Sequence, residues 1–291
     1  MTTIKRSVVR GTSLLAMQKR VFFGLLVASV GAFPAFAADS GEQGVKVNRA
    51  LTLDQGATVA IAGFKAMPEQ PVKRANFKRE SASQDARQVA DWIADSGDNR
   101  GLPFVIIDKK EAKVFVFHAD GLLRGAAPAL LGLALGDDSV PGIGDRKLST
   151  IRPDERTTPA GRFVAALDRN LHGGEILWVD YDAAISLHPV VTSNLKEQRA
   201  QRLATPTPLD NRISYGCINV PAEFYKSVVS LAFKGTNGIV YVLPETRTVQ
   251  QVFAAYDVDE RERSMLAGQL LPAQLASQAL DSPVAPNLTA R

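Results

Sequence analysis

The chain has 291 residues, of which 45% are apolar and 22% are charged, a composition typical of ordinary globular proteins. The formal net charge of +4 comes from the N-terminus, because residues 1–37 hold five basic residues and no acidic one, whereas the remainder holds 29 basic and 30 acidic residues. A remainder this close to neutral excludes a bulk electrostatic attraction to nucleic acid or another polyanion.

Residues 1–37 have the pattern of a secretory signal peptide. A basic stretch ends at Arg20, an apolar run follows from Val21 to Phe33, and Ala35-Phe36-Ala37 matches the small-x-small pattern that precedes cleavage. The apolar run is shorter than the about 20 residues that a membrane-spanning helix needs. We expect an exported protein, periplasmic or cell-wall associated, with no membrane span after signal removal. An uncleaved membrane anchor is the alternative.

The segment 38–100 is predicted to be a linker followed by one amphipathic helix. Gly and Pro are scattered over residues 38–80, and no apolar periodicity there marks a core. Residues 81–96 carry apolar side chains at helical spacing, with Ser81 and Gln84 placed as a capping box and Gly97 as a stop signal.

Residues 102–244 are predicted to form a mainly β domain with a few helices (α+β), sandwich- or barrel-like. Apolar or alternating runs indicate strands at 104–107, 113–117, 129–133, 161–167, 175–179, 184–188 and 238–243. A helix is expected at 221–233, with Pro221 in its first turn. The last segment, 245–291, is expected to hold a short helix at 248–256 and then a loose tail rich in Ala, Gln and Pro.

The only cysteine, Cys217, is the first candidate functional residue. A single cysteine forms no internal disulfide, so in an exported chain it is an intermolecular bridge, a buried side chain or a reactive thiol. Gly216 before it lets the backbone approach a ligand closely, and N–H groups at such a turn are candidates to hold an oxyanion. A helix that begins at Pro221 would favour the thiolate.

A cysteine nucleophile usually needs a base, and the chain has three histidines. His188 ends a strand-like run and precedes Cys217 closely enough to share one site with it. His118 is interpreted as a surface or edge residue and His172 as a loop residue. No two histidines stand at metal-ligand spacing and the cysteine is isolated from them, so no metal site is predicted.

Two motifs resemble the L,D-transpeptidase catalytic domain (YkuD) family. Ser214-Tyr215-Gly216-Cys217-Ile218-Asn219 is similar to its Ser/Thr-His-Gly-Cys signature, and Thr158-Pro159-Ala160-Gly161-Arg162-Phe163 to an upstream Thr-Pro-x-Gly-x-Phe element. The resemblance covers roughly residues 102–244. It implies the family's β fold, Cys217 as nucleophile, His188 as base and no cofactor.

Further expectations concern the residues around this pair. The oxyanion turn is assigned to Ser214, Tyr215 and Gly216, with Ser214 and Asn219 holding its shape. The resemblance implies that the carbonyl of Pro189 orients His188. Arg212, close to Cys217 in sequence, is the candidate contact for a substrate carboxylate.

Two features depart from the family pattern. Tyr215 stands where the family usually has His, which predicts altered polarity around the thiol rather than lost activity. The loop between His188 and Cys217 is longer than usual and contains a basic stretch, Asn194–Leu203, expected to be a short helix. This stretch is either a solvated insertion, the preferred interpretation, or a lid that recognises carboxylates of a peptidoglycan stem.

The resemblance implies an activity and leaves alternatives open. It implies a thioester acyl-enzyme on the stem tetrapeptide of peptidoglycan, release of D-Ala, and transfer to a second stem peptide or to an outer-membrane lipoprotein. The same acyl-enzyme resolved by water would make the protein an L,D-carboxypeptidase or amidase. A non-catalytic cell-wall-binding module and a dimer linked through Cys217 are the remaining alternatives.

Overall fold

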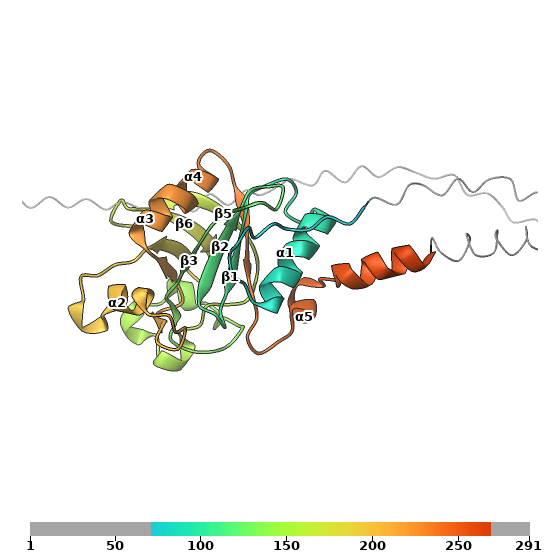
Figure 1. Ribbon diagram of the computed structural model, residues 1–291. Helices are drawn as coiled ribbons and strands as arrows, with labels where there is room; N and C mark the ends of the chain where they lie inside the picture. Colours follow the sequence, from blue (N-terminus) through green and yellow to red (C-terminus); the bar gives the residue numbers. More distant parts are fainter. Residues whose placement is uncertain (1–70, 269–291) are drawn as a thin grey trace, which may run out of the picture. The chain divides into compact units, whose positions relative to one another are not determined.

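A computed structural model describes residues 71–268 (Figure 1). The predicted signal peptide, residues 38–70 of the predicted linker and the tail from residue 269 lie outside the described residues. Within 71–268 no helix has the length and apolar character needed to cross a bilayer.

Strands dominate the fold, which confirms the mainly β class with a few helices. The strands are β1 (Phe104–Asp108), β2 (Lys113–Phe117), β3 (Leu123–Pro128), β4 (Leu131–Gly132), β5 (Gly161–Arg169), β6 (Glu175–Asp180), β7 (Ile185–Pro189), β8 (Arg212–Ser214), β9 (Ile218–Val220) and β10 (Gly238–Val242). The α-helices are α1 (Gln84–Ser96), α2 (Arg199–Ala204), α3 (Ala222–Phe224), α4 (Ser230–Phe233) and α5 (Val249–Phe253). A π-helical stretch, Tyr225–Val229, joins α3 to α4, residues 258–268 are helical, and short 3-10 helices lie at Ile143–Asp145, Leu148–Thr150, Pro153–Glu155 and Leu195–Glu197.

Eight strands form one sheet that almost closes on itself. Their order is β3-β2-β1-β10-β5-β6-β7-β9, with the pairs β1–β10 and β7–β9 parallel and the other pairs antiparallel. Leu130, just after β3, exchanges two backbone hydrogen bonds of 2.8 and 2.9 Å with Asn219 of β9. The two edge strands therefore meet, and the sheet is a nearly closed barrel.

Both faces of β2 are buried, which explains its alternating sequence. Val114 and Val116 pack into one apolar cluster, while Phe115 and Phe117 pack into a second, because successive strand residues face opposite sides. The first cluster includes residues of the π-helical stretch and α4, and the second includes residues of α1 and α5. Helices thus cover both faces of this part of the sheet (Figure 1).

The structure corrects the prediction at the N-terminal side of the sheet. Phe77, which falls in the predicted linker, is 4% exposed and packs edge-on against the ring of Phe115. The described end of the linker is therefore part of the core. Helix α1 begins three residues later than predicted, because Ser83 rather than Ser81 is the N-cap, and its Oγ accepts from the N–H of Ala86 at 3.1 Å.

The strand predictions also differ from the structure in three places. The run predicted at 129–133 is buried but contributes only the two-residue strand β4. Strand β3 was not predicted, because its sequence LRGAAP lacks alternating large apolar residues. Gly125 fits closely there, since a Cβ on it would lie 3.2–3.3 Å from the side chains of Val228 and Phe224, which would have to move by a few tenths of an ångström. Strands β8 and β9, with three residues each, carry too little periodicity to predict.

Candidate active site

The parallel pair β7–β9 brings the two principal candidate residues to one face of the sheet. His188 is the register partner of Asn219, and Cys217 lies two residues before Asn219. Because residues two apart in a strand share a face, Ser186 also belongs to this group. The Oγ of Ser186 lies 3.6 Å from the Sγ of Cys217. The alternate residues, among them Ile218, point into the first apolar cluster and fix the register.

The imidazole of His188 is held in one tautomer by its neighbour. Its Nδ1 lies 2.8 Å from the carbonyl oxygen of Pro189. A carbonyl only accepts, so Nδ1 carries the hydrogen and Nε2 is left with a lone pair in the neutral ring. This is the contact that the sequence resemblance implied for Pro189. It leaves Nε2 as the atom available to take a proton from Cys217.

The thiol and the imidazole shift each other's pKa. Burial would raise the pKa of the Cys217 thiol, but the hydrogen bond and charge of His188, together with Ser186, outweigh it and lower that pKa below 9.0. Burial would likewise lower the pKa of His188, but Cys217 and the Pro189 carbonyl outweigh it and raise that pKa above 6.5. Each of the two groups therefore favours the charged form of the other.

A predicted source of thiolate stabilisation is absent from this arrangement. Strand β9 separates Cys217 from the helix that begins at Ala222, and three extended residues span about 10 Å. A helix dipole acts mainly within its first turn. The expectation that this helix lowers the thiol pKa was therefore wrong, and His188 and Ser186 act in its place.

The turn before Cys217 is closed by Ser214 and by the special backbone of Gly216. The Oγ of Ser214 donates to the carbonyl of Cys217 at 2.6 Å and accepts from the N–H of Gly216 at 3.0 Å. Gly216 has φ +128°, and a Cβ there would lie 2.6 Å from Ile185 Cδ1 and 2.8 Å from Thr157 O. The position thus requires glycine, and its amide is already used within the turn.

The turn is anchored by a threonine whose role was not predicted. Thr158 is fully buried, and its Oγ1 donates to the carbonyl of Gly216 at 2.8 Å while accepting from the N–H of Gly132 at 2.9 Å. Its own carbonyl accepts from Nζ of Lys109 at 3.0 Å. The Thr-Pro motif was visible in the sequence, but the partner of its hydroxyl was not.

Lys109 belongs to a buried cluster of charges behind the turn. Its ammonium is 0% exposed and donates to Asp137 at 2.8 Å and to the carbonyl of Gly136 at 2.6 Å. Burial, the largest effect, lowers the pKa of Lys109 despite these partners. Glu245 lies 3.6 Å from the same ammonium. The cluster satisfies each charge with an opposite one.

Arg212 is drawn into that cluster rather than toward Cys217. Its guanidinium pairs with Glu245 and donates to the carbonyl of Lys109 at 3.0 Å. It lines a cavity of about 480 Å³ that does not include Cys217. The carboxylate of Glu245 already accepts from both terminal nitrogens of this guanidinium. The structure therefore does not support the predicted contact between Arg212 and a substrate carboxylate.

Cys217 is half-buried and opens into a narrow cavity of about 70 Å³. Tyr215 lines the same cavity, and the guanidinium of Arg156 lies 3.9 Å from the centre of its ring. The aromatic ring of Tyr215 is thus held by a cation–π contact. Residues of the segment between β4 and β5, Arg146 among them, also line this cavity.

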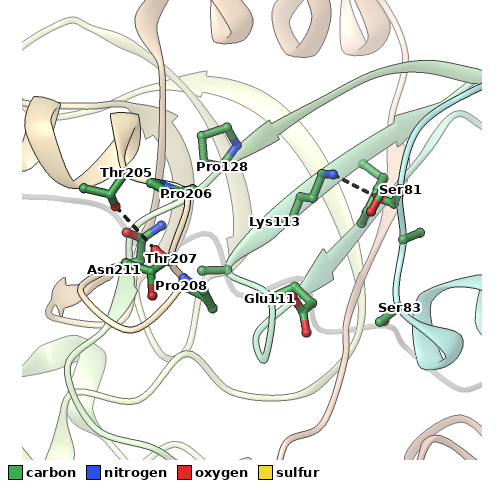
Figure 2. A pocket seen from close by; sticks show the side chains of 13 residues that line it. Ser81, Ser83, Glu111, Lys113, Pro128, Thr205, Pro206, Thr207, Pro208 and Asn211 are labelled. Carbon is green, nitrogen blue, oxygen red and sulfur yellow. Dashed lines mark hydrogen bonds between the residues drawn. The ribbon is translucent and has the colours of Figure 1, made fainter.

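Other cavities lie nearby. His188 lines a cavity of about 390 Å³ together with Glu175, Tyr225 and Lys226. A further cavity, of about 550 Å³, lies between the residues before α1, strand β2 and residues 205–211 (Figure 2). It is larger, but neither Cys217 nor His188 lines it. We therefore place the candidate chemistry at the cavities of about 70 and 390 Å³, which Cys217 and His188 line.

One residue of the predicted basic stretch reaches the site. Nη1 of Arg199, in α2, donates to Oδ1 of Asn219 at 2.6 Å. The preferred interpretation of this stretch as a solvated insertion was therefore wrong for Arg199, which is 14% exposed. The sequence shows that this stretch is basic. It does not show that Arg199 contacts Asn219, because no spacing rule connects the two residues.

The remaining histidines lie apart from this arrangement. His118 and His172 are both exposed. In the part of the chain that the structure describes, no three His, Cys, Asp or Glu side chains come together as metal ligands.

Comparison with protein-family models and with curated proteins finds no match. Among solved structures, the catalytic domain of an L,D-transpeptidase from E. faecium aligns at 18% identity and TM-score 0.29, over 49% of this chain and 98% of that one. An L,D-transpeptidase from Xylanimonas cellulosilytica aligns at 14% identity and TM-score 0.32, over 49% and 60%. The helical cell shape determining protein Pgp2 from Campylobacter jejuni aligns at 16% identity and TM-score 0.35, over 67% and 65%.

The alignments span about half to three-fifths of the first structures found. At these identities and TM-scores the likeness carries no inference about activity.

Proposed function

We propose that this protein is an exported cysteine acyltransferase that acts on peptidoglycan stem peptides, with Cys217 as nucleophile and His188 as base. The observation that carries the proposal is the meeting of one thiol and one imidazole across β7 and β9, with the thiol pKa lowered and the imidazole pKa raised. Perturbed, mutually coupled groups beside a cavity are typical of catalytic sites. The sequence resemblance supplies the substrate class.

The first half of the reaction forms a thioester. Nε2 of His188 takes the proton of the Cys217 thiol, and the thiolate attacks the amide carbonyl between the third stem residue and the following D-Ala. In this scheme the Cys217 N–H faces the developing oxyanion. Donors of this kind are worth roughly 3–4 kcal/mol of barrier. The proton on His188 passes to the leaving amine as the C–N bond breaks.

The second half transfers the acyl group to an amine. A side-chain amine of a second stem, or of an outer-membrane lipoprotein, loses its proton to Nε2 of His188 and attacks the thioester carbonyl. The C–S bond breaks, a new amide forms, and the thiolate is restored beside the imidazolium. No cofactor enters either half. In this scheme Ser214, Gly216 and Asn219 hold the turn in shape.

The test is incubation of the full chain with a purified tetrapeptide muropeptide, followed by mass analysis of the products. Transfer predicts cross-linked dimers and free D-Ala, and the Cys217→Ala variant should form neither. A tripeptide without dimers would replace the transferase with a hydrolase that uses the same acyl-enzyme. Unchanged muropeptide with both proteins would overturn the proposal.

A second measurement separates an enzyme from a binding module. A carbapenem acylates the thiol of the family that the sequence resembles, so a covalent adduct on Cys217 is expected by intact-mass analysis. A protein that binds muropeptides but forms no adduct would be a cell-wall-binding module. Non-reducing electrophoresis tests the remaining alternative. A disulfide through Cys217 would give a dimer band without reductant and a monomer band after reduction.

A further inference from the structure

The connection between β7 and β8 holds a basic helix, α2, that contacts the candidate active site at one point. Within α2, Arg199 is 14% exposed, and its Nη1 donates to Oδ1 of Asn219 at 2.6 Å. Asn219 is fully buried, so this amide oxygen depends on the protein for its partner. A charged donor to a buried amide is among the stronger hydrogen bonds in proteins.

The other end of the same amide faces the pair. Nδ2 of Asn219 donates to the carbonyl of Cys217 at 3.3 Å and lies 3.4 Å from Nε2 of His188. The guanidinium has no acceptor, so it can bond only to the oxygen end of the amide. Arg199, at the oxygen end, and the Cys217 carbonyl, at the nitrogen end, together set which end of Asn219 faces His188.

We propose that Arg199 is a positioning residue that holds the Asn219 amide with its N–H₂ end toward Nε2 of His188. The role of the Cys217–His188 pair in this inference rests on the proposed function above. The contacts of Arg199 themselves do not depend on it.

The orientation matters because the two ends of an amide favour different forms of the imidazole. An N–H₂ group beside Nε2 is compatible with a lone pair there, and hence with the neutral ring that accepts the thiol proton. A flipped amide would present its oxygen to Nε2–H and would stabilise the imidazolium. The positive charge of Arg199 acts in the same direction as the amide, since it disfavours the imidazolium.

The position of Arg199 is itself fixed. Its Nε pairs with the carboxylate of Glu197 at the start of the helical segment. Arg202, one turn further on, donates through Nε to the carbonyl of Glu197 at 2.8 Å and through Nη1 to the carbonyl of Asp210. Arg202 is thus a second arginine of α2 that bonds within the connection but does not touch Asn219, which makes it a matched control.

Other charged groups also face His188 and are kept constant in the test. Glu175 on β6 and Lys226 on the π-helical stretch line the same cavity as His188, together with the hydroxyl-bearing Tyr225. Cys217 and Arg199 are the other charged groups that act on the ring, the first raising and the second lowering its pKa. Apart from Arg199 itself, none of these residues is changed in the Arg199 variants.

The experiment is an NMR titration of the His188 imidazole in the full chain. The chain has only three histidines, so the resonance is assigned from the spectrum of a His188→Gln variant. In Arg199→Met we expect the His188 pKa to rise by roughly one unit, a tenfold shift in its protonation equilibrium. Arg199→Lys retains a charge and a donor and should stay closer to wild type. Arg202→Met should titrate as wild type does.

The variants also separate the two contributions of Arg199. Arg199→Gln keeps an N–H donor for Asn219 but no charge, so we expect a smaller rise in the His188 pKa than in Arg199→Met. An unchanged titration in Arg199→Met, or an equal shift in Arg202→Met, would overturn the positioning role. Folding of each variant is checked by dispersion of the amide spectrum, and Arg199→Gln serves if Arg199→Met does not fold.

The titration uses no substrate, so its result does not depend on the proposed function. An unchanged His188 pKa in Arg199→Met would rule out the role of Arg199 but would leave the roles of Cys217 and His188 to be tested by the muropeptide assay. Retained muropeptide conversion in Cys217→Ala removes the proposed function while leaving the measured influence of Arg199 on His188.

Discussion

Thr158 donates a 2.8 Å hydrogen bond from its hydroxyl to the carbonyl oxygen of Gly216, 58 residues away in sequence. The Thr-Pro motif and the Gly-Cys motif thus meet in one contact, and the same hydroxyl accepts from Gly132 of β4 at 2.9 Å. The backbone that leads into Cys217 is therefore fixed by a residue of the loop before β5.

Thr158→Val is expected to destabilise the fold and to lower the reactivity of Cys217. The change keeps the shape of the side chain but leaves the Gly216 carbonyl and the Gly132 amide buried without a partner. Each unpaired group costs about 1–3 kcal/mol, so we expect a loss of roughly 2–4 kcal/mol in urea unfolding. Thr158→Ser retains the hydroxyl and should lose much less. A Val variant as stable as wild type would show that the two groups find other partners.

Lys109→Met is expected to be far more damaging than the same change at the next residue. Lys109 is 0% exposed and paired with Asp137 at 2.8 Å, so its removal leaves the buried carboxylate of Asp137 without its ammonium partner, at a cost of about 3–5 kcal/mol. Lys110 is 50% exposed and pairs with Asp85, an interaction worth about 0–1 kcal/mol. Thermal and urea unfolding of the two variants measure the difference. Similar losses at both positions would contradict a structural role for the buried charge.

The sequence predicts well those elements whose residues alternate strongly. The KVFVF run of β2 places valines and phenylalanines on opposite faces, and the structure finds two separate apolar clusters there. Strand β3 was missed because its Gly and Ala residues give no apolar alternation. Gly125 of this strand packs closely against Val228 and Phe224, which lie about 100 residues further along the chain. Local periodicity does not encode such a contact.

The same limit applies to the candidate site. Cys217 and His188 are recognisable from their residue types, and Ser186 follows from period two along β7 once that strand is assigned. Arg199 and Thr158 reach the site only through tertiary contacts with Asn219 and Gly216. Arg212 was misplaced because closeness in sequence to Cys217 says nothing of Glu245, which lies 33 residues away and takes up its guanidinium.

Gly216→Ala is expected to abolish the reactivity of the thiol. The residue has φ +128°, which an L side chain rarely adopts, and a Cβ would lie 2.6 Å from Ile185 Cδ1 and 2.8 Å from the carbonyl of Thr157. The turn must shift to accept it, which displaces Cys217 from His188.

Gly173→Ala is the matched control, because Gly173 also has positive φ, +78°, but a Cβ there meets nothing within 4 Å. Labelling of Cys217 by iodoacetamide should be lost in the first variant and kept in the second. Equal labelling in both would mean that the turn tolerates the clash.

Alkylation of Cys217 is expected to begin well below the pH at which an ordinary thiol reacts. Its pKa is lowered from 9.0 by His188 and Ser186 against the opposing effect of burial, so the thiolate is present once the pH exceeds that lowered value. In His188→Gln the charge is removed and burial, the largest effect, dominates. The alkylation rate near neutral pH should then fall about tenfold for each unit by which the pKa rises.

The same shifts make stability depend on pH with a definite sign. The stabilisation from the Cys217 thiolate is present above 9.0 and is lost as the pH falls through the lowered pKa of the folded state. The stabilisation from the His188 imidazolium is present below 6.5 and is lost as the pH rises through its raised folded pKa.

For the alkylation experiment, total labelling measured by intact mass reports Cys217 alone, because the chain has one cysteine. His118→Gln, at an exposed histidine, is the control, and an identical rate profile in His188→Gln would refute the coupling of the pair.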